Sequence, residues 1–296
     1  MMRAVMISNP AASRFREHHV ARACLRLERG GLSVATVRTG GPGDAARLAR
    51  AALDDGADLL IAHGGDGTVM EVAGVLAAGP RPIGILPAGT GNLLAGNLGV
   101  PRDPRRAADV ILGGTRRVID LGRLRTREGS RFFAVACGAG ADAELMRRTD
   151  PARKRRFGAA AYFASALALA RDIPRATFRI ETDGEVHEGR GAMVLVANCR
   201  YLYPRLLPLP DRVRPDDGRF DVALCDASSA AGVLRLALHL ALRRGGAPAG
   251  VTYLRAARLR LSAVPELPVE ADGEPAGTTP LEVDILPGGL AVLAPS

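Results

Sequence analysis

The chain has 296 residues, of which 47% are hydrophobic and 24% charged. These values exclude a disordered, collagen-like or coiled-coil chain and leave room for about two globular domains. The four cysteines are scattered without a C-x-x-C pair, which excludes a disulfide framework and a cysteine-based zinc site. Lysine and arginine (40) outnumber aspartate and glutamate (31), yet Lys154 is the only lysine. That count excludes a P-loop, a protein kinase and a Schiff-base enzyme.

Neither export nor membrane insertion is expected. The apolar run at residues 3–8 is too short for a signal peptide and breaks at Asn9-Pro10. The mostly apolar segment 158–170 is shorter than the roughly 18 residues that a span needs. We therefore expect a cytoplasmic protein. With no Trp and few Tyr and Phe there is little to stack bases on, so we expect no nucleic-acid partner.

The first third of the chain alternates apolar strands with helical periodicity. Strands are expected at 3–8, 32–39, 58–62 and 83–86, and helices at 16–29, 44–55 with Asp44 as N-cap, and from 68 to about 78. Such alternation predicts a doubly wound parallel sheet with right-handed crossovers. Ligands bind at the carboxyl ends of the strands in such sheets, and four successive strands here end in turn-forming residues.

From about residue 121 the sequence pattern changes to short β-like runs separated by turns. We expect strands at 131–137, 177–182, 192–197, 219–225, 251–261 and 281–285, and a helix at 230–243. The predicted fold class is α/β plus β: a nucleotide-binding α/β domain (1–121) and an antiparallel β-rich domain (122–289). We expect the tail 290–296 to return to the first domain, and the active site to lie in the cleft between the domains.

Two glycine-rich segments follow strands of the first domain. In Gly64-Gly65-Asp66-Gly67-Thr68 the glycines let backbone N–H groups approach an anion, and a carboxylate among them fits phosphate only with an intervening cation. Asp66 therefore points to Mg²⁺ with a nucleotide. The spacing of Thr68 and Glu71 also predicts a capping box on the next helix. The segment 87–92 follows its strand in the same way, and its Thr90 hydroxyl is placed to reach a phosphate.

These segments resemble the diacylglycerol kinase catalytic-domain family. The resemblance rests on three segments: Asn9 to Ser13, the segment 64–68 (the glycine loop) with Glu71, and Leu86-Pro87-Ala88-Gly89-Thr90-Gly91-Asn92. It continues through residues 120–122, 138–143, 198–204, 217–222 and 272–274. It implies an ATP- and Mg²⁺-dependent lipid kinase. NAD kinases and phosphofructokinases share the glycine loop but not the second motif, so NAD kinase is the alternative; a third option is a non-catalytic nucleotide- or lipid-binding regulator.

The resemblance also implies roles for individual residues. Glu274 matches the catalytic carboxylate, Asp66 supports catalysis and binds metal, and Asp217 matches an auxiliary Mg²⁺ site. Leu93 and Arg14 depart from the family, standing where many bacterial members have Asp and Gly, and Leu93 removes one carboxylate of the metal network. The implied nucleotide contacts are Asn9, Pro10, Ser13, Arg14, Thr39, Gly64, Gly65, Asp66, Gly67, Thr68, Glu71, Gly89, Thr90 and Asn92.

The implied substrate lies in a membrane. Arg153, Arg155 and Arg156 precede Phe157, a basic and apolar mixture that suits an anionic bilayer. We therefore expect peripheral membrane association with a lipid substrate, while a solvated helix remains the alternative, and a homodimer is compatible with the sequence. The tripeptide Asp-Gly-Glu occurs at 183–185 and 272–274, and both copies read as hairpin turns, of which the resemblance selects the second for catalysis.

Overall fold

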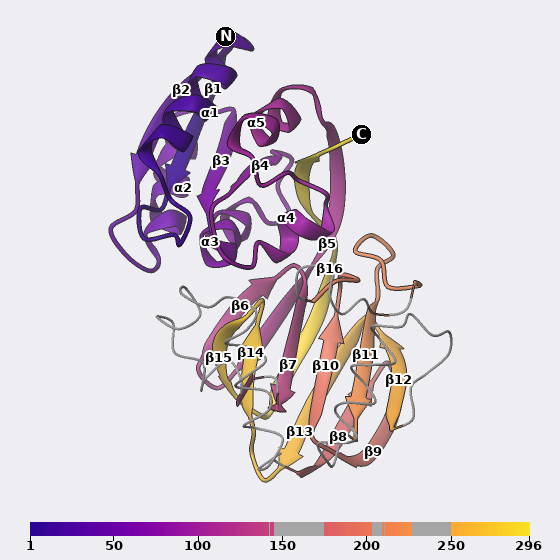
Figure 1. Cartoon of the computed structure of the whole chain (residues 1–296). Helices are drawn as coiled ribbons and strands as arrows, with labels where there is room; N and C mark the ends of the chain where they lie inside the picture. Colours follow the sequence, from indigo (N-terminus) through magenta and orange to yellow (C-terminus); the bar gives the residue numbers. More distant parts are fainter. Residues whose placement is uncertain (142, 145–174, 203–208, 210, 227–249) are drawn as a thin grey trace. The chain divides into compact units, whose positions relative to one another are not determined.

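The computed structural model describes residues 1–141, 143–144, 175–202, 209, 211–226 and 250–296. The chain forms two compact units, Met1–Ile119 with Gly288–Ser296, and Asp120–Pro287 (Figure 1). The predicted helix 230–243 and the basic segment 153–156 lie outside the described residues. No helix in the described part of the chain is long and apolar enough to cross a membrane.

The first unit is built on a parallel sheet. Its strands are β1 (Met2–Ser8), β2 (Leu32–Arg38), β3 (Leu59–Gly64) and β4 (Ile83–Pro87), in the order β2-β1-β3-β4. The end of β16 (Leu281–Ala294) lies beside β4, with Val292 opposite Ile83 and parallel to it. Every residue of β3 is buried, as expected for a parallel strand covered on both faces.

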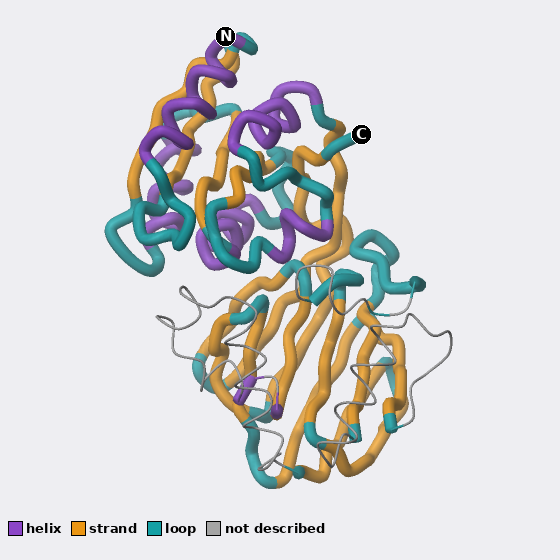
Figure 2. Tube along the Cα trace, in the orientation of Figure 1, coloured by secondary structure: helices purple, strands orange, loops and turns teal. Residues whose placement is uncertain are grey.

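The helices of this unit flank the sheet (Figure 2). They are α1 (Glu17–Arg29), α2 (Asp44–Asp54), α3 (Asp66–Leu76), α4 (Leu93–Asn97) and α5 (Pro104–Gly113). The chain passes from β1 to β2 on one side and then crosses back to β3 and β4 on the other side of β1. With right-handed crossovers, α1 therefore lies on the opposite face of the sheet from α2 and α3. The packing agrees, because α1 contacts α5 and α2 contacts α3. The predicted doubly wound sheet is confirmed.

The second unit is antiparallel. One sheet has the order β12-β11-β10-β7-β14-β15, and the other contains β5, β6, β8, β9, β13 and the first part of β16. A single hydrophobic cluster from both sheets includes Phe133, Phe178 and Phe220. The β-rich prediction is confirmed. The strands are β5 (Thr115–Thr126), β6 (Gly129–Phe133), β7 (Ala136–Gly140), β8 (Ala176–Thr182), β9 (Glu185–Gly191), β10 (Met193–Ala197), β11 (Phe220–Cys225), β12 (Val251–Ala256), β13 (Arg258–Val264), β14 (Pro268–Ala271) and β15 (Glu274–Thr278).

Two runs predicted as single strands are each interrupted. The run 131–137 breaks between β6 and β7, where the amides of Ala134 and Val135 donate to the carboxylate of Asp272. The run 251–261 breaks between β12 and β13 at Ala257, whose amide donates to Asp183. In both places a distant aspartate takes backbone donors that a continuous ladder would have used.

Candidate active site

The loops that follow β1, β3 and β4 meet at one edge of the first unit. Ser8 at the end of β1 pairs with His63 of β3, and Gly64 pairs with Pro87 at the end of β4. The strands therefore end nearly level. Strand order reverses between β1 and β3, and ligands of doubly wound sheets bind outside the carboxyl ends of strands at such a reversal.

Side chains tie the first loop to the other two. The Asn9 side-chain amide donates to the Thr68 hydroxyl at 3.0 Å, and the backbone amide of Asn9 donates to the carbonyl of His63. The hydroxyls of Ser13 and Thr90 are 2.9 Å apart and hydrogen-bonded. Residues far apart in sequence that the resemblance marks as nucleotide contacts are thus brought together within the first unit.

Asp66 joins the glycine loop (residues 64–68) to the loop that follows β4 (residues 88–92). It is the first residue of α3, and its two carboxylate oxygens accept the backbone amides of Asn92 at 2.8 Å and Leu93 at 2.5 Å. Both donors stand at the start of α4, so the carboxylate meets the positive end of a second helix. Asp66 therefore has a structural task at this edge, and its predicted role toward Mg²⁺ stays a prediction.

The two loops are in backbone contact. The Asn92 side chain closes the loop after β4 on itself. Its amide oxygen accepts from the Gly89 backbone amide and its NH₂ group donates to the Gly89 carbonyl, both at 2.8 Å. A Cβ atom added to Gly89 would lie 2.5 Å from the Cα of Gly65, whereas one added to Gly65 would lie 3.4 Å from the Cα of Gly89. Only the first distance is shorter than real contacts allow.

We expect Gly89→Ala to push the loops apart and Gly65→Ala to be accommodated. Overpacking against backbone typically costs about 1–3 kcal/mol, so Gly89→Ala should lower the free energy of unfolding by about that amount and weaken ATP binding. Gly65 has a φ of −88°, which alanine adopts without strain, so Gly65→Ala should keep wild-type stability. Thermal unfolding of both variants measures the contrast, and equal stability losses would contradict it.

The predicted caps in this region were wrong. Thr68 lies inside α3 rather than at its N-cap, which is Gly65. Glu71 reaches instead to the start of α2, where its carboxylate accepts the amides of Gly43 at 2.9 Å and Ala46 at 3.3 Å. Asp44 is the first residue of α2 and its N-cap is Gly43. The carboxylate of another helix thus satisfies donors that a local cap would have taken.

His63 is a buried histidine at the end of β3. Its ring Nδ1 lies 2.8 Å from the hydroxyl of Ser8, and its ring is tilted against Phe15 with the centroids 5.9 Å apart. Burial, with a smaller contribution from the charge of His19, lowers the pKa of His63 from 6.5 to about 4. The imidazole is therefore neutral in the folded protein at neutral pH.

We expect the pKa of His63 to make stability fall in mild acid. The unfolded chain binds a proton near pH 6.5 and the folded chain only near pH 4, so the stability that this group supplies is lost as the pH falls through that window. The loss should reach about 3 kcal/mol at pH 4. Urea unfolding of wild type and His63→Asn between pH 7.5 and 4 should give a flatter profile for the variant, and parallel profiles would refute the assignment.

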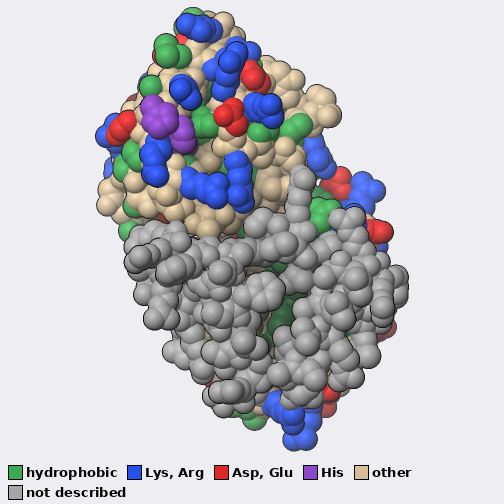
Figure 3. All heavy atoms as spheres, in the orientation of Figure 1, with side chains coloured by type: hydrophobic (Ala, Val, Ile, Leu, Met, Phe, Trp, Pro, Cys, Tyr) green, Lys and Arg blue, Asp and Glu red, His purple; other side chains and the backbone are tan. Residues whose placement is uncertain are grey.

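The remaining predicted nucleotide contacts lie on the loop after β1 and on a fourth loop, after β2. Thr39 follows β2, and its amide donates to the carbonyl of Ser8 at 3.0 Å, while Pro10 lies in the turn after β1. Arg14 is exposed, and Figure 3 shows Lys or Arg side chains gathered over this unit on the face in view. Arg102 was not predicted; its guanidinium donates to the carbonyl of Gly91 at 3.2 Å, a contact that no local pattern announces.

The two Asp-Gly-Glu copies both form two-residue hairpin turns in the second unit. Asp183 and Asp272 have φ of 26° and 48°, and the following glycines also have positive φ. The copies differ in how their aspartates are held: Asp183 accepts one amide, from Ala257, whereas Asp272 accepts three, from residues 134, 135 and 136.

The second hairpin therefore presents Glu274 from a fixed turn. The Glu270 carboxylate adds a fourth restraint by accepting the amide of Gly273 at 2.7 Å. Glu274 itself begins β15 and is exposed, so its carboxylate is accessible from solvent. A restrained backbone with an accessible carboxylate suits a base that must meet a substrate hydroxyl.

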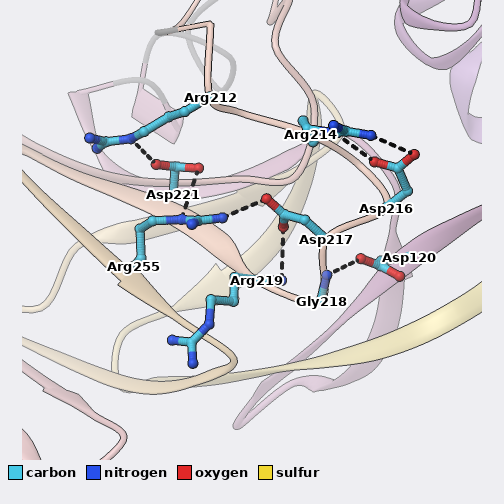
Figure 4. A network of polar contacts seen from close by, with 9 residues as sticks. All are labelled: Asp120, Arg212, Arg214, Asp216, Asp217, Gly218, Arg219, Asp221 and Arg255. Carbon is cyan, nitrogen blue, oxygen red and sulfur yellow. Dashed lines mark hydrogen bonds and ion pairs between the residues drawn. The ribbon is translucent and has the colours of Figure 1, made fainter.

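Asp217 lies in a network of carboxylates and arginines in the second unit (Figure 4). Its carboxylate receives the guanidinium of Arg255 at 2.5 Å and the amide of Arg219 at 3.1 Å. The neighbouring Asp120 is buried and accepts the amide of Gly218 at 2.8 Å. These contacts give Asp217 a guanidinium partner where the resemblance implies a metal.

The residues fit Mg²⁺ at one predicted position better than at the other. In the described part of the chain no three His, Cys, Asp or Glu side chains converge as a metal cluster. Mg²⁺ bound with substrate phosphates needs only one or two carboxylates, so a nucleotide-borne ion fits the first-unit edge beside Asp66. Asp217, already paired with a guanidinium, does not fit an auxiliary ion.

Comparisons with known proteins agree with this architecture. The Diacylglycerol kinase catalytic domain model matches residues 3–124, and the YegS C-terminal NAD kinase beta sandwich-like domain model matches residues 135–294. A crystal structure described as a diacylglycerol kinase from Bacillus anthracis superposes with a TM-score of 0.76 at 21% identity, covering 99% of this chain and 96% of that one. Another B. anthracis structure gives 0.82 at 24% identity, covering 99% and 95%. At these identities the structures support the fold alone.

The match of the first unit to the Diacylglycerol kinase catalytic domain model places the chain in the class of lipid kinases. Curated relatives narrow this further. The chain is 30% identical to the diacylglycerol kinase of Bacillus subtilis, covering 95% of this chain and 93% of the relative. It is 32% identical to the diacylglycerol kinase of Mycobacterium tuberculosis, with 92% and 88% covered. The chain belongs to the diacylglycerol kinase family, which confirms the resemblance and the expectation of an enzyme.

Proposed function

We propose that this protein transfers the γ-phosphoryl group of ATP to the hydroxyl of diacylglycerol. The observation that carries the proposal is the hydrogen-bonded meeting of the Asn9, glycine and Thr90 loops at one sheet edge. There the backbone start of α3 and the exposed Arg14 offer donors to phosphate oxygens. The names of the two curated relatives support diacylglycerol as the first substrate to test.

In the proposed reaction the lipid hydroxyl oxygen attacks the γ-phosphorus as the bond to the β–γ bridging oxygen breaks. Glu274 accepts the hydroxyl proton, and ADP leaves with the displaced electron pair. Mg²⁺ bound to the phosphates neutralises their charge when present. The chain's own residues orient the phosphates through backbone amides and hydroxyls, which explains how a unit with no lysine can hold them.

A radiolabel transfer assay tests the proposal. The full chain is incubated with γ-labelled ATP and Mg²⁺, and with vesicles that contain diacylglycerol, ceramide or a long-chain base, or with NAD or buffer alone. Labelled phosphatidate from the diacylglycerol arm is the expected result. Label only in a different lipid would overturn the substrate, and label in NADP would overturn the lipid kinase. ATP binding with no labelled product in any arm would overturn the proposed enzyme and favour the non-catalytic regulator.

The same assay also tests the membrane expectation. Phosphatidylglycerol added to the vesicles at constant diacylglycerol should raise the rate, because basic surfaces bind anionic bilayers, and added salt should reduce that gain. A rate that does not depend on the anionic lipid would contradict peripheral binding through charge.

A further inference from the structure

The carboxylates between residues 216 and 221 are each matched by an arginine of the second unit. Asp216 binds Arg214 through two contacts of 3.1 and 3.5 Å. Asp217 binds Arg255 at 2.5 Å. The cluster is therefore close to neutral without any bound ion.

The third carboxylate of the cluster, Asp221, is 4% exposed and would be costly to bury without a partner. Its two oxygens lie 2.7 Å from the Arg212 Nε and 3.7 Å from the Arg255 Nε. Arg255 therefore faces two carboxylates at once.

The strands explain why Arg255 stands there. It lies on β12 directly opposite Asp221 of β11, and Asp217 lies in the turn that leads into β11. A guanidinium has five donors in a planar fork, so a single arginine can bridge two carboxylates from neighbouring positions. Figure 4 shows the side chain between the two aspartates. The fork thus sits where a cation would balance both charges.

A divalent ion has no place in this arrangement. Mg²⁺ requires a near-octahedral shell of oxygen ligands and would lie within a few ångströms of the Arg255 guanidinium, which repels it. The Asp217 oxygens are engaged by Arg255 and by the Arg219 amide.

We infer that the guanidinium of Arg255 replaces the auxiliary divalent cation that the family resemblance implies at Asp217. The loop 216–221 is then held by a built-in cation, and any Mg²⁺ requirement of the protein arises from the nucleotide alone. The inference is independent of the proposed phosphoryl transfer, because its test uses neither ATP nor lipid.

Nucleotide-free cation binding tests the replacement. Mn²⁺ stands in for Mg²⁺ and is titrated into the full chain while electron paramagnetic resonance reports the free ion. Wild type and Asp217→Asn should bind Mn²⁺ alike, and Arg255→Gln should gain a site with roughly tenfold or more higher affinity. Adding Asp217→Asn to that variant should remove the gain. Thermal unfolding in EDTA and in MgCl₂ should show the same pattern.

The matched control is Arg260→Gln on β13. Arg260 also faces a carboxylate across two antiparallel strands, Glu282 at 3.6 Å, but both side chains are largely exposed. Its loss should create no Mn²⁺ site. Wild-type Mn²⁺ binding that Asp217→Asn abolishes would overturn the inference, and so would a folded Arg255→Gln without new affinity. If Arg255→Gln does not fold, the comparison of wild type with Asp217→Asn still decides, and Arg255→Lys should behave as wild type does.

Discussion

Glu274→Gln should reduce turnover by about 10²- to 10⁴-fold while ATP affinity stays unchanged. A general base contributes about this factor, and glutamine keeps the size of the side chain but cannot accept the proton. The turn that carries Glu274 is held by the carboxylates of Asp272 and Glu270, so the substitution at the exposed first residue of β15 should not disturb the fold. Single-turnover phosphoryl transfer and calorimetric ATP binding are the measurements.

The chain provides its own control for this experiment. Glu185 follows the other Asp-Gly turn, is also exposed, and begins β9 as Glu274 begins β15. Glu185→Gln should leave turnover unchanged. If Glu185→Gln were the inactive variant, the second unit would have been matched to the family incorrectly, and full activity of Glu274→Gln would exclude it as the base.

Asp66→Asn should abolish turnover and also destabilise the protein. An asparagine offers one acceptor oxygen and one NH₂ group, so one of the amides of Asn92 and Leu93 must face a donor. Hydrogen bonds to a charged group contribute about 1.5–3 kcal/mol, and we expect a loss of about that size. Freed from Asp66, the start of α4 should no longer hold the Thr90 loop beside Ser13, and ATP binding should weaken.

A chemically identical change elsewhere in the unit separates local from general effects. Asp103 is the N-cap of α5 and accepts the amide of Arg106 at 2.9 Å. Asparagine caps helices about as well as aspartate, so Asp103→Asn should keep wild-type stability and activity. Wild-type stability and ATP affinity in Asp66→Asn would show that the carboxylate does not join the loops. Loss of turnover with wild-type stability would show instead that Asp66 acts directly at the nucleotide phosphates and their metal ion.

The alternation of strands and helices was readable from sequence because burial on both faces and helical spacing are local patterns. The same holds for the hairpins at Asp183 and Asp272, whose Asp-Gly turns need positive φ at both positions. The caps were wrong because the partners are tertiary. Thr68 and Glu71 have the spacing of a capping box, but Asn9 takes the hydroxyl and the start of α2 takes the carboxylate.

The ends of strands depended on contacts that no window of sequence contains. The strand expected at 281–285 continues to Ala294 through Pro287 and two glycines, residues that normally end a strand. The pairing of Asp217 with Arg255 joins residues 38 positions apart. It was not predicted, because the resemblance suggested a metal ion as the partner of Asp217. Both cases required the register of neighbouring strands, which only the folded chain supplies.

The path of β16 has a consequence for how the protein is made. Residues 288–296 complete the first unit: Val292 lies beside Ile83, and the carbonyl of Gly289 accepts the amide of Ala78. The whole second unit, Asp120–Pro287, is synthesised between Ile119 and these residues. At about 5–20 residues per second, the ribosome would delay the last strand of the nascent first unit by on the order of ten seconds. Until then the β4 edge of that sheet is open to chaperones and to pairing with other chains.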